Sequence, residues 1–241
     1  MVEPLLTLAG VHTHIAQYHI LQGVDFAVPR GELTMLLGRN GAGKTTTLRT
    51  ILGLWRASAG AIRFDGGEIS ALDTPAIAGL GIAYVPESMG IFAGLTVHEN
   101  LLLAARNGPL QEERLERIFR FFAPMKKFWD LPAGNLSGGQ KQMLSISRAI
   151  VEPRKLILID EPTKGLAPAI IQNLIAAFAE LKQTDTTILM VEQNFHAAKS
   201  LGDSVAVMDA GRIVHTGRMA ELAADNALQT RLLGLSLEAH Q

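Results

Sequence analysis

The chain has 241 residues, with 22 lysines and arginines against 23 aspartates and glutamates, and 48% of its residues are hydrophobic. This length and composition fit one sizeable domain with a buried core. The net charge of −1 argues against a nucleic-acid-binding protein that relies on a wide basic face. Cysteine is absent, which excludes disulfides and thiolate metal sites. We find neither a signal-peptide pattern nor an apolar run long enough for a membrane helix, so we expect membrane association only through a partner.

The first forty residues alternate apolar and polar side chains around turn residues such as Pro29 and Gly31, which predicts antiparallel strands. Residues 33–37 then form an apolar run that ends at a glycine-rich turn, and a helix-compatible stretch follows over residues 45–53. Farther along, strands are predicted at residues 156–159, 187–191 and 204–208, with a helix at 169–181. Such alternation implies a mainly parallel sheet that is covered on both faces.

Residues 93–150 have a helical pattern almost throughout. Residues 112–122 form an amphipathic helix within them, with charges on one side and large apolar side chains on the other. The apolar side carries Leu115, Ile118, Phe119 and Phe122. We therefore predict a single domain, residues 1–241, in which a helical lobe, residues 93–150, is inserted into an α/β core, residues 1–92 and 151–241.

The glycine-rich turn matches the pattern G-x-x-x-x-G-K-[ST] without departure. Glycines let successive backbone N–H groups point inward around an anion, and the helix that follows aims its positive N-terminal end at the same place. Lys44 is expected to reach the β- and γ-phosphates of a nucleoside triphosphate, and the Thr45 hydroxyl is expected to bind Mg²⁺. The predicted nucleotide-binding residues are Gly38, Arg39, Asn40, Gly41, Ala42, Gly43, Lys44, Thr45 and Thr46.

Two acids, Asp160 and Glu161, end the apolar strand at residues 156–159. In P-loop enzymes such an aspartate holds Mg²⁺. We expect Glu161 to orient or deprotonate the water that attacks the γ-phosphate. The alternative is a pair of solvated acids at the end of a strand.

The pentapeptide LSGGQ precedes the helical stretch at residues 141–151. Its serine hydroxyl, two glycines and helix N-terminus make it a second anion-binding device, with a simple serine N-cap as the alternative. Its predicted nucleotide contacts are Ser137, Gly138, Gly139 and Gln140.

The order of these motifs, with LSGGQ between the phosphate loop and the acidic strand end, resembles the ATP-binding subunits of ABC transporters over the whole chain. The resemblance implies a P-loop NTPase (RecA-like) core with an N-terminal antiparallel β region and an inserted α-helical lobe. It implies ATP and Mg²⁺ as ligands, and a head-to-tail dimer in which each ATP lies between one subunit's phosphate loop and the other's LSGGQ. The implied partners are a second ATPase subunit and two transmembrane permeases, at the cytoplasmic face of the inner membrane, with no nucleic acid.

Several segments resemble the ATPases of branched-chain amino acid importers more narrowly. They are Ala83-Tyr84-Val85-Pro86-Glu87, Gly165-Leu166-Ala167-Pro168, Val191-Glu192-Gln193-Asn194 and Leu232-Leu233-Gly234. These importers typically pair two different ATPase subunits and receive solute from an extracytoplasmic binding protein. The present sequence is similar to the subunit with V-E-Q-N, while importers of urea, short amides and aromatic acids share much of the pattern. We expect most aromatic residues of the helical lobe to pack its interior, and one or two of them to line a groove that, as the resemblance implies, receives a helix of the permease.

Four positions depart from the general ABC pattern. Glu87 replaces a glutamine that binds Mg²⁺, and Gln193 replaces a histidine that contacts the γ-phosphate. Ala167 replaces an aspartate at the subunit interface. Because Gln193 and Ala167 weaken different parts of the sites, we expect the two ATP sites of the dimer to be unequal. The adenine-stacking aromatic falls near Ile15, and Tyr18 is our candidate for it.

Three alternatives to an importer ATPase remain open from the sequence. They are a soluble ABC ATPase that is not linked to transport, an exporter ATPase, and a regulatory subunit that binds ATP without hydrolysing it. Retention of Glu161 favours hydrolysis, with Glu161, Lys44 and Gln193 as the expected catalytic residues.

Overall fold

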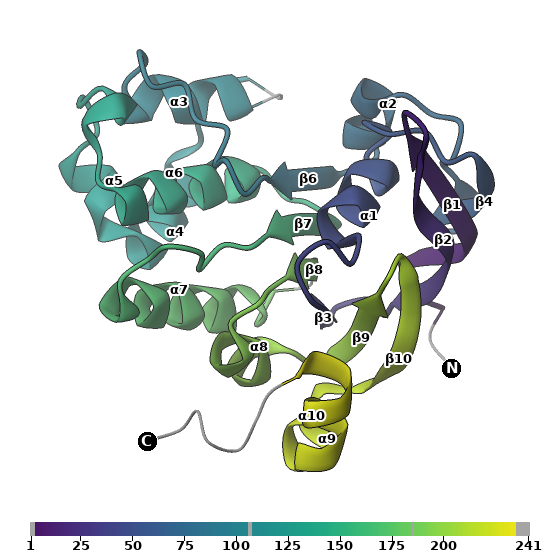
Figure 1. Cartoon of the computed structure of the whole chain (residues 1–241). Coiled ribbons are helices and arrows are strands. Elements are labelled where there is room, and N and C mark those ends of the chain that lie inside the picture. The colour runs from purple at the N-terminus through teal and green to yellow at the C-terminus, as the bar shows by residue number, and fades with distance from the viewer. Residues whose placement is uncertain (1–2, 106–107, 185, 235–241) are drawn as a thin grey trace.

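The computed structural model describes residues 3–105, 108–184 and 186–234. The chain forms two sheets flanked by helices (Figure 1). The first sheet has the order β2-β1-β4-β5 and is antiparallel at each pairing. Its strands are β1 Leu6–Ile15, β2 Tyr18–Val28, β4 Ala59–Phe64 and β5 Gly67–Glu68. The prediction of an N-terminal antiparallel region is confirmed.

The second sheet has six strands in the order β10-β9-β3-β8-β7-β6. All neighbours run parallel except the edge pair β9 and β10, which is antiparallel. The strands are β3 Leu33–Leu37, β6 Ile82–Val85, β7 Leu156–Asp160, β8 Thr187–Val191, β9 Ser204–Asp209 and β10 Arg212–Arg218. Each strand predicted from an apolar run is present, because a strand buried on both faces has an unbroken apolar sequence.

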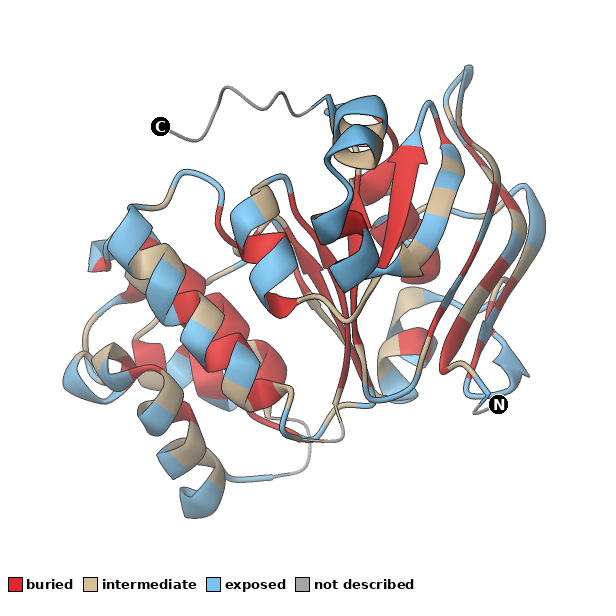
Figure 2. Ribbon diagram, turned by 90° about the horizontal axis from the view of Figure 1, so that it is seen from below, coloured by how far each residue is buried: buried red, intermediate tan, exposed pale blue. Residues whose placement is uncertain are grey.

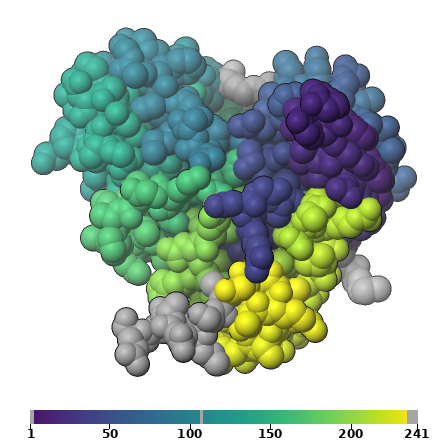
Figure 3. Space-filling model, in the orientation of Figure 1, coloured from purple at the N-terminus to yellow at the C-terminus, as the bar shows by residue number. Residues whose placement is uncertain are grey.

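Helices cover both faces of the six-stranded sheet and form the lobe beside it. Around the core lie α1 Lys44–Ile51, α2 Thr74–Gly79, α7 Pro168–Leu181, α8 Phe195–Leu201, α9 Met219–Ala224 and α10 Asn226–Leu233. The lobe contains α3 Val97–Ala104, α4 Glu112–Phe121, α5 Ala123–Lys127, the 3₁₀ turn Ala133–Asn135 and α6 Gly138–Ile150. In the space-filling view these segments lie opposite the N-terminal strands and the C-terminal helices (Figure 3). The helical lobe is therefore present, while its boundaries at residues 93 and 150 stay a prediction.

Two apolar clusters fill the space on either side of strand β3. Met35 and Leu37 belong to the cluster shared with α3, α6 and α7, whereas Leu36 belongs to the cluster shared with α1 and the antiparallel sheet. Successive side chains of a strand point to opposite faces, so one short strand joins both clusters. The buried strands run through the middle of the molecule, and the exposed residues lie on the outer faces of the helices (Figure 2).

Helix α6 begins three residues earlier than the stretch predicted at residues 141–151. Ser137 is its N-cap, and the side chains of Ser137 and Gln140 each accept a hydrogen bond from the other residue's backbone N–H. This capping box lets both glycines of LSGGQ join the first turn of the helix. The LSGGQ segment is thus mostly helical, and the predicted start of the helix was wrong.

Candidate functional site

The phosphate loop joins the end of β3 to the start of α1, as the motif predicts. Gly38 has φ of 147°, and a Cβ at this position would lie 2.1 Å from the carbonyl oxygen of Met208. Gly43 has φ of 110°, and its Cβ would meet Leu21 at 3.0 Å. A side chain at either position would collide with β9 or β2, so these glycines let the loop lie directly on the sheet.

Lys44 is only 5% exposed although it carries a charge. Its ammonium donates to the carbonyl oxygens of Gly38 and Arg39, at 2.8 and 3.1 Å. Burial lowers the pKa of Lys44, and the nearby carboxylates of Glu161 and Asp160 oppose that shift. A buried cation bonded to its own loop is well placed to exchange these carbonyls for phosphate oxygens.

The Thr45 hydroxyl donates to Asp160 Oδ1 at 3.1 Å, so the expected metal ligands of the two motifs lie side by side. Asp160 is fully buried, and burial raises its pKa, while the hydrogen bonds from Thr45 and Tyr84 act in the opposite direction. A hydroxyl and a carboxylate are hard oxygen donors of the kind that Mg²⁺ prefers. No cluster of three or more His, Cys, Asp or Glu side chains suited to a metal occurs among the described residues.

Tyr84 also contacts Asp160, and the sequence alone did not indicate this contact. Its hydroxyl, on strand β6, donates to Asp160 Oδ2 at 3.3 Å. Burial, followed by the charge of Asp160, raises the pKa of Tyr84 to about 12. The phenol therefore stays a donor across the physiological range and holds the second carboxylate oxygen. The pairing of β6 with β7 places it there, with Tyr84 opposite Leu158.

Glu161 follows β7 with φ of 47°, a left-handed conformation that is uncommon for a residue with a side chain. Its backbone N–H donates to the carbonyl of Val191, and its Oε1 accepts a 2.5 Å hydrogen bond from the Gln193 amide. The structure therefore brings Glu161 and Gln193 together, as the prediction of a shared catalytic site requires. Strained backbone of this kind persists where the surrounding contacts hold it, and it is common in active sites.

Glu192 is a second residue that sequence reasoning did not assign to the site. It is 2% exposed, and its carboxylate accepts backbone hydrogen bonds from Thr163, Gln193 and Asn194. Burial raises its pKa, against the effect of these hydrogen bonds. It ties the segment after β8 to the segment after β7, and so fixes Gln193 relative to Glu161. The sequence feature that could have indicated Glu192 is its position directly after the apolar run of β8.

Glu87 lies after β6, and its carboxylate contacts Lys164 rather than the Thr45–Asp160 pair. Lys164 Nζ is 2.7 Å from Glu87 Oε1 and 3.4 Å from Glu161 Oε2. The hydrogen bond to Glu87, followed by the charge of Glu161, raises the pKa of Lys164. Ala167, the other departure in this segment, is the N-cap of α7 and makes no side-chain capping bond.

A cavity of about 250 Å³ opens over the phosphate loop. It is lined by Ile20, Asn40, Gly41, Gly43, Lys44, Thr45, Thr46 and Glu161. Ser137, Gly138, Gly139 and Gln140 do not line it, so the described part of the chain brings the phosphate loop and the acidic end of β7 (the two Walker motifs) together and leaves LSGGQ elsewhere. Tyr18 does not line it either; its side chain is 63% exposed at the start of β2, two residues before Ile20.

The sequence of this chain is similar to those of known proteins whose names state ATP binding. The family model described as ABC transporter matches residues 21–164. The chain is 36% identical to BraG of Pseudomonas aeruginosa, a high-affinity branched-chain amino acid transport ATP-binding protein, over 95% of this chain and 100% of BraG. It is 34% identical to LivF of Archaeoglobus fulgidus, a probable branched-chain amino acid transport ATP-binding protein, over 96% and 99% of the two chains.

Solved structures give the same result. A chain described as the ATP binding subunit of an ABC transporter superposes with a TM-score of 0.80 at 32% identity, over 97% of this chain and 96% of that one. A nucleotide-free ATP-binding cassette from an ABC transporter superposes with a TM-score of 0.82 at 26% identity, over 97% and 100%. The family model covers more than half of the chain, and the two Walker motifs meet as that family requires. This chain therefore belongs to the ABC transporter family, as one of its ATP-binding, ATP-hydrolysing subunits.

Proposed function

We propose that this chain hydrolyses ATP to power an importer of branched-chain amino acids, or of a related small polar or amphipathic solute. The observation that carries the proposal is the full-length similarity to BraG and LivF, whose names state branched-chain amino acid transport. A more distant relative named as a ribose import ATP-binding protein shows that solute choice varies among similar chains. No helix of the described residues is long and apolar enough to cross a membrane. We propose that the chain works with two permease partners, as the importer assignment implies, at the cytoplasmic face of the inner membrane.

Within the proposed mechanism, the phosphate loop and Lys44 bind the triphosphate, and the Glu161 carboxylate accepts a proton from the attacking water. Gln193 holds Glu161 Oε1 through its amide and contacts the γ-phosphate. Thr45 and Asp160 would hold Mg²⁺, which neutralises phosphate charge when it is bound, whereas Glu87, the third expected ligand, pairs with Lys164 in this structure. Because Tyr84 donates a hydrogen bond to the second oxygen of Asp160, the orientation of this carboxylate toward the metal position is fixed.

A second ATPase subunit completes each site in this proposal. LSGGQ is exposed at Ser137 and Gly138 and does not line the cavity over the phosphate loop, so we infer that it serves the ATP of the other subunit. A paralogue with a histidine at the position of Gln193 is the partner we propose, because LivG-type relatives accompany the LivF-type ones among the similar proteins.

The permease contact is proposed for a groove of about 410 Å³ between β6, α3 and α6. Pro86, Met89, Gly90 and Leu103 line it, and Leu103 is 60% exposed. The backbone carbonyls of Met89 and Gly90 accept hydrogen bonds from Ser145 and Arg148 of α6, the helix that begins with LSGGQ. A helix in this groove would press on both the Glu87 loop and the LSGGQ helix.

The lobe's aromatic side chains are mostly used in packing. Phe122 is 1% exposed, and Trp129 lies between His98 and Phe119, with ring centroids 4.7 and 5.5 Å away. We therefore favour Leu103 and the loop after β6 over the aromatic residues as the permease contact.

The first test is recovery of the tagged full-length chain from its native membrane, with associated proteins identified by mass spectrometry. Two permeases and a histidine-bearing ATPase are the expected partners. Recovery on ribosomes or alone would contradict the transporter assignment. The second test reconstitutes that complex in vesicles with its extracytoplasmic binding protein and measures ATP-dependent uptake of leucine, urea, short amides and aromatic acids. Uptake of none of these would contradict the proposed solute class.

A further inference from the structure

A single lysine stands between two carboxylates of the site that come from different segments of the chain. Lys164, in the turn that leads from β7 to α7, has its ammonium 2.7 Å from Glu87 Oε1 and 3.4 Å from Glu161 Oε2. Glu87 belongs to the loop after β6, and Glu161 follows β7 directly. One cation thus joins the loop that faces the proposed permease groove to the proposed general base.

The contact with Glu161 falls on the oxygen that has no other partner in the described residues. Oε1 accepts from the Gln193 amide, whereas Oε2 is buried and accepts no hydrogen bond. The Glu161 side chain is 9% exposed, so water does little to stabilise this oxygen. The ammonium of Lys164 at ion-pair distance supplies the stabilisation that solvent does not.

The charge of Glu87 favours a cation beside it, in addition to Lys44 and to the Mg²⁺ proposed at Thr45 and Asp160. Glu87, Asp160 and Glu161 bring three negative charges near a triphosphate that is itself strongly negative, and Lys44 offsets one of them. The carboxylate of Glu87 adds to this negative charge from the loop after β6. Lys164 forms its shortest contact with this residue, at 2.7 Å.

We propose that Lys164 is a positioning residue for ATP hydrolysis, which compensates the extra charge of Glu87 and holds the second oxygen of Glu161. This inference rests on the proposed role of Glu161 as the base. Lys164 does not line the cavity over the phosphate loop, and neither does Glu87, so the pair acts through Glu161 and not by contact with the phosphate loop.

The test is a set of variants of the full-length chain, each purified together with its partner ATPase subunit and measured for ATP hydrolysis. Lys164→Met is expected to lower kcat about fivefold, the upper range for a half-exposed ion pair, with the KM for ATP within about twofold of wild type. Adding Glu87→Gln removes the uncompensated charge, so the double variant Lys164→Met/Glu87→Gln is expected to recover to within about twofold of Glu87→Gln alone. Lys164→Arg keeps the cation and is expected to retain wild-type kcat within about twofold.

Lys199→Met provides the matched control, since it removes an exposed lysine of α8 outside the site. Equal melting temperatures across the set show that each variant is folded. A kcat of Lys164→Met within twofold of wild type would overturn the proposal, as would a double variant no better than Lys164→Met. Because only ATP hydrolysis is measured here, a failure of solute uptake in the importer test would not change the conclusion about Lys164.

Discussion

The phosphate loop and LSGGQ are both glycine-containing turns that precede a helix, yet they are built differently. In the phosphate loop, Gly38 and Gly43 have left-handed backbone pressed against neighbouring strands, and Lys44 is buried. In LSGGQ, Ser137 and Gln140 form an ordinary capping box, Gly138 faces open space and only Gly139 is closely packed. The phosphate-loop half of the ATP site is formed within the chain, whereas LSGGQ is exposed at Ser137 and Gly138 and needs a second surface. The difference indicates which half of each ATP site a single subunit supplies.

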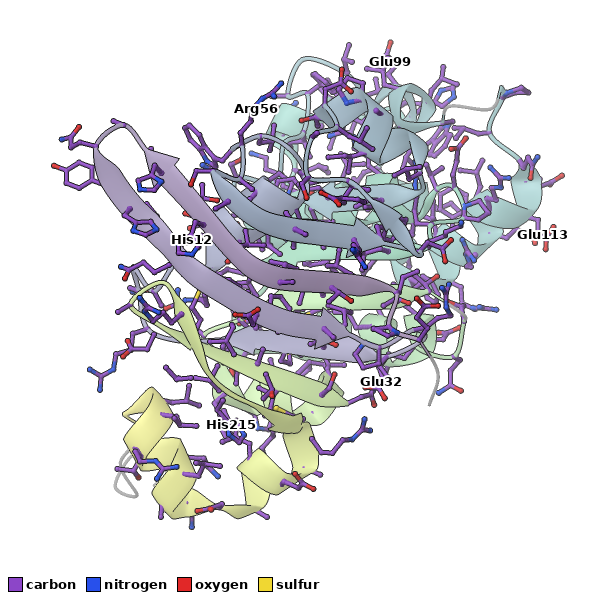
Figure 4. The ribbon with its side chains drawn as sticks, turned by 90° about the vertical axis from the view of Figure 1, so that its right-hand side faces the viewer. His12, Glu32, Arg56, Glu99, Glu113 and His215 are labelled. Atoms are coloured by element: carbon purple, nitrogen blue, oxygen red, sulfur yellow. The ribbon has the colours of Figure 1, made fainter. Side chains whose placement is uncertain are left out.

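The largest effect is expected at the phosphate-loop half. Glu161→Gln should lower kcat by about 10²–10⁴-fold, because an amide cannot take the proton of the attacking water. ATP binding should persist, since Lys44 and the loop glycines are unchanged. The hydrolysis rate of the purified variant tests the expected loss of kcat, and its affinity for ATP tests whether binding persists. Glu113→Gln on the exposed face of α4 is the control (Figure 4). Retention of wild-type hydrolysis by Glu161→Gln would remove Glu161 from the role of base.

The two glycines of LSGGQ give the next contrast. A Cβ at Gly139 would lie 2.8 Å from Ile170 of α7, whereas a Cβ at Gly138 meets nothing within 4 Å. Gly139→Ala should therefore lower the free energy of unfolding by about 1–3 kcal/mol relative to Gly138→Ala. Chemical denaturation measures this difference.

Activity should separate the same two variants in the opposite sense. Gly138→Ala should keep its stability and lose hydrolysis in the assembled dimer, because the added methyl lies on the exposed side that we assign to the partner's ATP. Equal stability of the two variants would show that Gly139 is not a packing requirement. Full activity of Gly138→Ala would remove that face from the ATP site.

Much of the site was predictable because its chemistry is local in the chain. The phosphate loop needs glycines at fixed spacings and a lysine at the helix start, and Asp160 and Glu161 follow a strand whose apolar run is unmistakable. Tyr84, Glu192 and Lys164 were not predicted, because each has at least one partner that is far away in sequence: Asp160, Thr163 and Glu87, respectively. Tyr84 meets Asp160 only once β6 pairs with β7, and that pairing leaves no local pattern.

The fold was predictable to a similar extent. Strands buried on both faces were identified by their apolar runs, whereas the start of α6 was placed too late because glycines are read as breakers. The assignment of Tyr18 to adenine stays a prediction. Ile20 lines the cavity two residues farther along β2, and the register of β2 shifts against β1 in this region.

Ser137 tests whether LSGGQ is more than a helix cap. Ser137→Ala removes the hydroxyl that accepts from the Gln140 N–H, and should lower the free energy of unfolding by about 1 kcal/mol. Thr96→Ala is a matched control, since Thr96 and Glu99 form the same capping box at α3. Both variants should lose similar stability in thermal unfolding, and only Ser137→Ala should also lower hydrolysis by the assembled dimer. An equal loss of hydrolysis in both would make Ser137 a cap and nothing more.

The smallest effect is expected at the histidines of the β1–β2 hairpin, which do not line the cavity over the phosphate loop. His19 stacks on His14, with centroids 4.2 Å apart, and its Nε2 lies 2.9 Å from Nδ1 of His12, which Figure 4 labels on the hairpin. Loss of hydration lowers the pKa of His19, and the charges of His14, His12 and Arg212 act in the same direction. The folded chain therefore binds a proton at His19 less readily than the unfolded chain does. The free energy of unfolding should therefore fall as the pH drops below about 6.5, the ordinary pKa of histidine. The fall should end once the pH is below the lowered pKa of His19 in the folded chain.

His19→Gln removes this contribution, so its melting temperature should fall less than that of wild type between pH 7.5 and pH 5.5. His196→Gln, on the exposed face of α8, is the control and should follow wild type. ATP hydrolysis of His19→Gln at neutral pH should stay unchanged, because His19 does not line the cavity over the phosphate loop. If the melting temperature of His19→Gln fell with pH as much as that of wild type, protonation of His19 would not be the cause of the loss of stability. A loss of hydrolysis would instead bring the hairpin into the nucleotide site, and would favour its aromatic residues as the adenine contact.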